Sequence, residues 1–184
     1  MRRLAAVVAA LVIALNAMAQ SHAGVTGGYN TSGYHAGITV YQPLGLGFAL
    51  QPSLVYAAKG TDWDEIISCK MGFIELPVQL QAGLDLLLFR PYLFVEPFVG
   101  YAVNGKLTPP AGLKELQLSD IENCLEYGLG LGGGVHLGRS FQLSIKYFWN
   151  FDNCGFGDYL ASVNSAFSER KQFTGMAVSA SILF

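Results

Sequence analysis

The stretch from residue 141 to residue 151, FQLSIKYFWNF, decides the fold of this chain because it alternates between two classes of side chain. Every odd position is large and apolar, whereas the even positions hold Gln, Ser, Lys, Phe and Asn. Successive side chains of a β-strand point to opposite faces, so this period of two predicts a strand with one apolar and one mixed face. The stretches 47–59, 71–84 and 126–137 show the same split.

The same periodicity, followed along the chain, predicts about eight strands. Their expected ranges are 24–30, 34–43, 47–59, 71–86, 91–104, 124–137, 141–152 and 171–184. Short connections alternate with long ones, and only the first outer loop, 31–33, breaks that alternation. The short ones are 44–46, 87–90 and 138–140, and the long ones are 60–70, 105–123 and 153–170. Short periplasmic turns and longer extracellular loops are typical of bacterial outer-membrane barrels.

The composition points to a membrane protein that does not cross the bilayer with helices. Hydrophobic residues make up 52% of the chain, yet no apolar run beyond residue 24 is long enough for a spanning helix. In lipid, the remaining way to satisfy every backbone polar group is a closed barrel. We therefore predict an all-β fold, a closed antiparallel transmembrane β-barrel in up-and-down meander order, with a soluble β-sandwich or lipocalin-like carrier as the alternative.

The N-terminus has the features of a secretory signal peptide. Two arginines precede the apolar run 4–15, and small residues follow it. The run is shorter than the roughly 20 apolar residues that a membrane-spanning helix needs. We predict a signal peptide over residues 1–23, cleaved after Ala19 or Ala23, and an outer-membrane barrel domain over residues 24–184.

The distribution of charge agrees with a membrane barrel. The formal net charge is −2 and becomes more negative once the two leader arginines are removed, which argues against a nucleic-acid partner. Most charged residues fall in the windows 59–70, 106–126 and 152–171, which are the predicted outer loops and adjoining strand tips. The apolar strand faces carry no formal charge, as expected because a Lys or Arg at the bilayer midplane costs about 2–4 kcal/mol.

Aromatic residues on the apolar faces gather toward the two ends of the strands. We expect them to form two girdles at the membrane interfaces, rather than an ordinary core. The girdle residues are Phe48, Tyr56, Tyr101, Tyr127, Phe141, Tyr147, Trp149, Phe151 and Phe184. The last of these ends an alternating final strand, which resembles the C-terminal signal read by the barrel-assembly machinery during insertion.

The mixed faces predict what fills the lumen. Within the expected strand interiors only Glu75, Glu96 and Lys146 carry formal charge, and we expect Lys146 to bridge one or both carboxylates because buried charges must be paired. The glycines at 128, 130, 132 and 134 are expected to face large lumen residues. Pro52, Pro77 and Pro97 lie within expected strands, where a bulge or a local unpaired position must accommodate each.

Residues suited to catalysis or metal binding are sparse. No pair among the three histidines has metal-ligand spacing, so we predict no catalytic residue, no metal and no cofactor. Cys69, Cys124 and Cys154 map to outer loops or their bases, where a loop disulfide or a free or intermolecular thiol are both open.

Five stretches resemble a known family. They are GGYN at 27–30, GYHAG at 33–37, LQPSLVYAAKG at 50–60, IELPV at 74–78 and YGLGLGGG at 127–134. Together they resemble the running pattern of the PorT-like outer-membrane β-barrel proteins of Bacteroidota, across nearly the whole mature chain. The resemblance implies a small eight-stranded barrel in the cell outer membrane and no reaction.

Three classes of function follow from this sequence. We favour a non-enzymatic barrel with a side-chain-filled lumen that serves as a structural or interaction scaffold through its extracellular loops. Its expected partners are outer-membrane lipid, the barrel-assembly machinery and an unidentified surface or periplasmic protein. The alternatives are an outer-membrane lipid-modifying enzyme, which would need a Ser/His pair on the lipid-facing side, and the soluble carrier.

Overall fold

The computed structural model describes most of the chain beyond the N-terminal segment, with gaps in some of the connections between strands. The described residues are 21–63, 67–86, 88–108, 116–117, 125–138, 140–152 and 174–184. Their strands are β1 (His22–Asn30), β2 (Gly33–Gly45), β3 (Phe48–Trp63), β4 (Ile67–Gly83), β5 (Phe89–Thr108), β6 (Leu116–Gln117), β7 (Leu125–Leu137), β8 (Phe141–Asp152) and β9 (Gly175–Leu183). The predicted signal peptide lies outside these residues, except for its last three positions.

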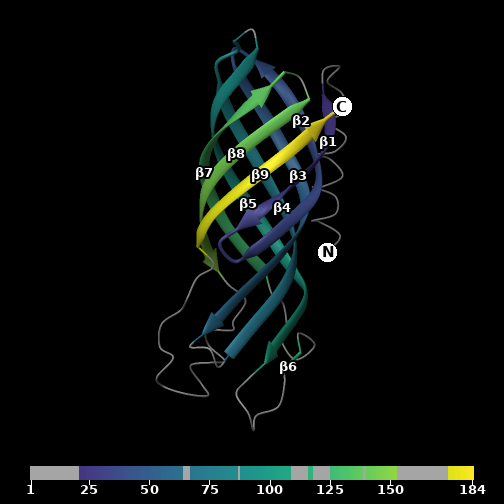
Figure 1. Cartoon of the computed structure of the whole chain (residues 1–184), viewed down its shortest axis with the longest axis vertical. Helices are drawn as coiled ribbons and strands as arrows, with labels where there is room; N and C mark the ends of the chain where they lie inside the picture. Colours follow the sequence, from purple (N-terminus) through teal and green to yellow (C-terminus); the bar gives the residue numbers. More distant parts are fainter. Residues whose placement is uncertain are drawn as a thin grey trace.

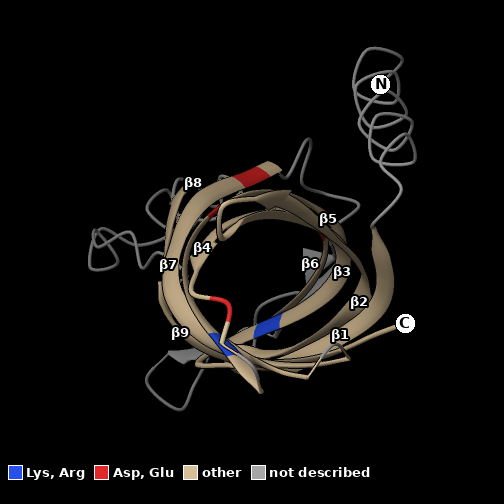
Figure 2. Cartoon of the chain, turned by 90° about the horizontal axis from the view of Figure 1, so that it is seen from above, with Lys and Arg blue, Asp and Glu red and all other residues tan. Residues whose placement is uncertain are grey.

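Eight strands close into a single antiparallel barrel. Each pairs with the next along the chain, β5 continues to β7, and β9 returns to pair with β1. Viewed down its axis, the barrel is a closed ring (Figure 2). The predicted fold class and meander order are therefore confirmed, and the two-residue β6, which pairs with the end of β5, is an addition.

No helix in the described part of the chain is long and apolar enough to cross a membrane.

The two ends of the barrel differ in the length of their connections. Short turns join β2 to β3, β4 to β5 and β7 to β8 at the end where the chain terminates (Figure 1). At the opposite end two residues separate β1 from β2 and three separate β3 from β4, and the long connections there are those between β5 and β7 and between β8 and β9. At that opposite end β3, β4 and β5 extend further than the sequence predicted, so much of the expected outer loop 60–70 is a paired hairpin. The charged residues of this segment favoured a loop, but the strands continue because β4 pairs with both β3 and β5 there.

The turn between β4 and β5 also differs from the prediction. We expected a strand to residue 86 and a turn over 87–90, but β4 ends at Gly83 and β5 begins at Phe89. The amide of Leu84 donates to the Pro91 carbonyl, and that of Leu86 to the Phe89 carbonyl, which closes a turn over 84–88.

The three strand prolines sit where the ladders are interrupted. Pairing skips Pro52 on the side facing β2, Pro77 on the side facing β3 and Pro97 on the side facing β4. Each proline keeps its partners on the other side. A proline has no amide hydrogen to give, so the expected local unpaired positions are present at all three sites.

The start of β1 leads to a prediction about processing. His22 pairs with Tyr41, Ala23 pairs with Val40, and the amide of Phe184 donates to the carbonyl of Ala23 at 2.8 Å. Cleavage after Ala23 would remove these contacts, so we expect cleavage after Ala19 and a mature chain that keeps His22 and Ala23 in the barrel. Intact mass and N-terminal sequencing of protein purified from outer membranes will check this, and a first residue of Gly24 would contradict it.

Candidate functional site

The lumen holds the residues that could carry a function, and its first cluster lies where β3, β4 and β7 face one another. Lys59 Nζ lies 2.6 Å from Glu75 Oε1 and 2.8 Å from Glu126 Oε1. The Lys59 side chain is 3% exposed and that of Glu126 is 0% exposed. Asn150 Nδ2 donates to the second oxygen of Glu126 at 2.7 Å. This cluster of Lys59, Glu75 and Glu126 is called the lysine cluster below.

Aromatic rings and a glycine shape the surroundings of the lysine cluster. Lys59 Nζ lies 5.0 Å from the ring centroid of Phe73 and 5.6 Å from that of Phe98, within the range of cation–π attraction. A Cβ on Gly100 would lie 2.7 Å from Glu126 Oε1 and 3.0 Å from Glu75 Cγ. A larger residue at Gly100 would therefore displace the two carboxylates from their shared cation.

A second ion pair lies further along the lumen. Lys146 on β8 donates to Glu96 on β5, and Gln79 Nε2 donates to the other oxygen of Glu96 at 2.7 Å. The Lys146 side chain is 18% exposed and that of Glu96 is 3% exposed, so this pair is slightly more open than the lysine cluster. Each carboxylate oxygen of Glu96 has a donor, as a buried carboxylate requires.

Toward the short-turn end the lumen is closed by a layer of amides. Gln51 Oε1 accepts from Gln81 Nε2 at 2.7 Å and from Gln142 Nε2 at 3.0 Å. Gln142 Nε2 also lies 2.5 Å from the Tyr92 hydroxyl, and Arg90 Nη1 donates to Gln81 Oε1 at 3.2 Å. All of these side chains are buried. The layer links β3, β4, β5 and β8 across the interior.

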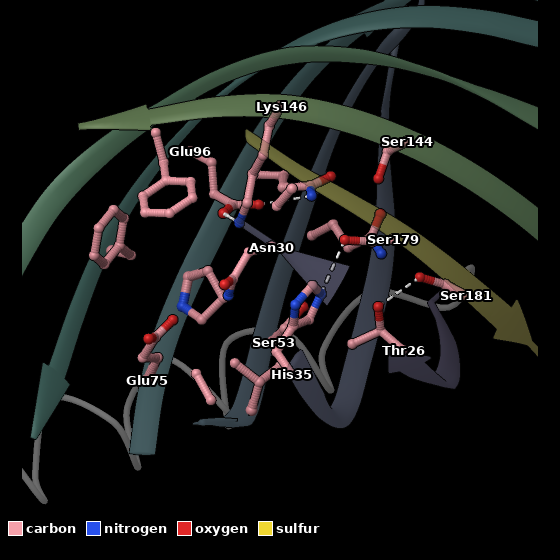
Figure 3. A pocket seen from close by; sticks show the side chains of 18 of the residues that line it. Thr26, Asn30, His35, Ser53, Glu75, Glu96, Ser144, Lys146, Ser179 and Ser181 are labelled. Carbon is pink, nitrogen blue, oxygen red and sulfur yellow. Dashed lines mark hydrogen bonds and ion pairs between the residues drawn. The ribbon is translucent and has the colours of Figure 1, made fainter. Parts of the chain in front are cut away.

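A small polar cavity remains beside the second ion pair. Its volume is about 40 Å³, and its lining includes Glu96, Lys146 and several hydroxyl groups (Figure 3). Within it His35 Nε2 lies 2.9 Å from Ser179 Oγ. Because one ordered water occupies roughly 10–15 Å³ of such volume, the cavity has room for a few waters.

The structure places Glu75, Glu96 and Lys146 inside the barrel, and the predicted bridge from Lys146 reaches one of the two carboxylates. Lys146 is paired with Glu96, whereas Glu75 is held by Lys59. The prediction that only Glu75, Glu96 and Lys146 are charged within the strands is wrong, because Lys59, Glu126 and Arg90 are also buried. Lys59 and Glu126 stood in the charge-rich windows assigned to loops and strand tips. Their position on the mixed face of each strand was the signal that could have identified them.

The predicted girdle residues all have exposed side chains on the outer surface of the barrel. Phe48, Phe141 and Phe184 lie at the short-turn end, and the other six lie nearer the long connections. The six are Tyr56, Tyr101, Tyr127, Tyr147, Trp149 and Phe151. Some form contacts within the girdle, such as Tyr147 and Trp149, whose ring centroids are 4.9 Å apart. The two-girdle interpretation stays a prediction, since no membrane boundary marks the heights of these residues.

The remaining predictions concern the three cysteines, metal binding and the lumen glycines. Cys124 and Cys154 lie outside the described residues, and of Cys69 only the backbone, in β4, is described. Among the described residues, no group of three or more His, Cys, Asp or Glu side chains could hold a metal ion. The lumen glycines meet large residues as expected, since a Cβ on Gly128 would overlap the Phe98 ring.

Comparison with known proteins gives a family match for the chain and several similar solved structures. A family model described as outer membrane protein beta-barrel domain matches residues 9–154. The N-terminal beta-barrel domain of Pseudomonas aeruginosa OprF has a TM-score of 0.50 at 10% identity, covering 89% of this chain and 96% of that chain. At this identity the likeness shows the fold alone. No curated protein matches the chain in sequence.

Two further solved structures are similar at lower TM-scores. A major outer membrane protein from Thermus thermophilus has a TM-score of 0.46 at 14% identity, over 89% of this chain and 99% of that chain. Ail, the attachment invasion locus protein of Yersinia pestis, has a TM-score of 0.46 at 11% identity, over 90% and 99%. The description of the matched family does not name the PorT-like proteins, so that resemblance stays a prediction.

Proposed function

Because the chain belongs to the outer membrane protein beta-barrel domain family, we propose that it is a non-enzymatic barrel closed by its own side chains. Its role in this proposal is that of a structural or interaction scaffold that presents its outer connections to a partner. The observation that carries the proposal is the filled lumen, in which the lysine cluster, the pair of Lys146 and Glu96 and a glutamine layer span the interior. An interior filled in this way is suited to rigidity rather than to passage of a solute.

The long-connection end supports the second half of the proposal. There β3, β4 and β5 continue beyond the last pair between β2 and β3, at Gly33 and Lys59, and β6 adds to the edge of β5 (Figure 1). The connections between β5 and β7 and between β8 and β9 begin at the same end. A rigid barrel that carries long connections at one end is a common arrangement for binding surfaces.

The enzymatic alternative has one observation in its favour, the hydrogen bond between His35 and Ser179. A nucleophile within hydrogen-bonding reach of a base is a feature of acyl-transfer sites. The pair, however, faces the small lumen cavity and not the lipid-facing side, where a lipid-modifying enzyme would need it. The same cavity is too small for the ligand of a carrier, since ligand pockets typically measure about 300–1,000 Å³.

The scaffold role can be tested by replacing the connection between β8 and β9. In one variant a short Gly-Ser linker replaces residues 153–174, and in a matched control the same residues are scrambled at constant length and composition. We expect cross-linking on intact cells to give a defined partner product with the natural protein and to lose it in both variants. All three proteins should stay folded in unheated detergent gels. A product that survives in both variants would contradict the proposed role of this connection.

The closed lumen gives a separate prediction about conductance. We expect the purified protein in planar bilayers to show no stable channel of the size of a general porin, because an eight-stranded interior is just wide enough for side chains to fill it. A 16-stranded porin recorded under the same conditions is the positive control. Stable openings comparable to those of the porin would contradict a closed barrel.

A further inference from the structure

Two neighbouring turns at the short-turn end of the barrel are unusually apolar. Leu44 lies at the end of β2, Leu46 lies in the β2–β3 turn, and the β4–β5 turn carries Leu84, Leu86 and Leu88; all five are exposed. Leu46 is 99% exposed and Leu88 is 80% exposed. Turns that project into water are normally polar, so four exposed leucines on two turns, with a fifth at the adjoining end of β2, require an explanation. These five residues are called the leucine rim below.

The backbone conformation at Leu46 makes a leucine at this position unusual. Its φ is 54°, between Gly45 at 91° and Gly47 at 80°. In this left-handed region a non-glycine residue is uncommon, and Asn or Asp is the usual exception. A leucine there gains nothing from packing within the barrel, because its side chain is almost fully exposed. The site therefore keeps an apolar side chain against both local conformation and exposure to water.

The leucine rim is an ordered part of the barrel. The amide of Gly83 donates to the carbonyl of Gly47 at 2.8 Å, which joins the two turns. Arg90 Nη2 donates to the same carbonyl at 2.7 Å. On the far side, the amide of Gly138 donates to the carbonyl of Leu88 at 3.2 Å. The exposed leucines are thus held in place by hydrogen bonds on both flanks.

The charged residue between Leu84 and Leu86, Asp85, is paired. Its Oδ1 lies 3.1 Å from Nε of Arg90; the Arg90 side chain is 9% exposed and that of Asp85 is 72% exposed. An ion pair lowers the cost of placing a carboxylate near an apolar medium. The third turn at this end has a different character, since its sequence at 138–140 is Gly-Arg-Ser. Among the three short turns at this end, the leucines therefore lie in or next to the two that join β2 to β3 and β4 to β5.

The leucine rim is continuous with the outer wall of the barrel. A groove of about 410 Å³ runs between them, lined by Leu46 and Leu84 from the turns and by Phe48 and Leu93 from the wall. The outer wall faces lipid in an outer-membrane barrel, where its apolar band meets acyl chains. The groove extends this lipid-facing surface over the end of the barrel without an intervening polar belt.

We propose that the leucine rim is a lipid-binding surface that embeds in the acyl-chain region of the membrane leaflet at the short-turn end. The occupant of the groove is a phospholipid acyl chain. Because the third turn is polar, the β2–β5 side of the barrel sits deeper in this leaflet than the β7–β8 side. The barrel is therefore seated with a tilt that its own turns determine.

The test uses single tryptophans in phosphatidylcholine vesicles. Trp63 and Trp149 are first replaced by Phe, and Leu88→Trp, Leu46→Trp or Ser140→Trp is then introduced. A protein that keeps only Trp149 is the reference for the lipid-facing wall. Each protein is reconstituted with and without phosphatidylcholine brominated on its acyl chains, and its emission is also measured with aqueous iodide. Unheated gels establish that each variant is folded. Two positions in the leucine rim are used so that the test remains possible if one of the two variants does not fold.

We expect brominated acyl chains to quench the Leu88→Trp and Leu46→Trp variants to the same extent as the Trp149 reference, and iodide to have little effect on them. The Ser140→Trp variant should show the reverse pattern. Quenching of both rim variants by iodide and not by bromine would overturn the proposal. If neither bromine nor iodide quenches the Leu88→Trp and Leu46→Trp variants, the proposal is also overturned, and the result would point to contact with a second copy of the chain.

Discussion

Replacing Lys59 with Met is expected to lower the free energy of unfolding of the barrel by about 3–5 kcal/mol, because it leaves buried carboxylates without a cation. Lys59 is the only lysine or arginine within 4.0 Å of Glu75 or Glu126 among the described residues. Replacing Lys146 should cost less, since that lysine neutralises one carboxylate and is more exposed. Denaturant unfolding of the refolded protein in lipid vesicles measures both changes.

The matched control for Lys59 removes the whole cluster together. A triple variant with Lys59→Met, Glu75→Gln and Glu126→Gln keeps the side-chain volumes and removes all three charges. It should be considerably more stable than the single variant, because the large cost comes from an uncompensated buried charge rather than from the loss of an attraction. If the single variant unfolds like the natural protein, the lysine cluster does not form as described.

The second large effect is expected on the outer surface. Leu131, at the centre of β7, is 56% exposed, and Leu125, on the same face at the start of β7, is 47% exposed. Replacing Leu131 with Arg should cost about 2–4 kcal/mol in vesicles, because the charge lies near the bilayer midplane. The same change at Leu125 should cost only about 0–1 kcal/mol, as expected near an interface.

The two arginine variants also separate a membrane barrel from a soluble one. In water, an arginine on an exposed face has little effect at either position, so a soluble barrel would tolerate both changes equally. Unfolding in vesicles and in detergent micelles gives the comparison. Equal stability of the two variants in vesicles would show that the outer face of β7 does not meet hydrocarbon.

The sequence predicted the strands well because one physical pattern dominates each of them. In β8 the alternation of apolar and mixed residues is unbroken, and the observed strand has the predicted bounds. Where a second pattern competed, the prediction failed. Charged residues after Lys59 suggested a loop, yet the hairpin continues to Trp63 because neighbouring strands pair with it there. Pairing with neighbours is a tertiary effect that local composition does not encode.

The lumen contacts were less predictable than the strands. Periodicity identifies the side of a strand on which a residue lies, but not the residue opposite it across the interior. Gln51 meets Gln142, which lies 91 positions further along the chain, and their contact depends on strand tilt and stagger. The pairing of Glu75 with Lys59 instead of Lys146 has the same origin. The sequence therefore predicted that these residues face inward and that Lys146 bridges Glu96, but it did not predict the partner of Glu75.

The pairing of β1 with β9 has a consequence for how the chain must assemble. Thr26 Oγ1 accepts from Ser181 Oγ at 2.8 Å across 155 positions of sequence, so the seam joins the two ends of the barrel domain. Until the last strand is available, β1 and β8 each leave a row of backbone amides unpaired, which is unfavourable in lipid. Closure must therefore follow the synthesis and export of the whole barrel domain, because the strand that completes the ring is the last one made.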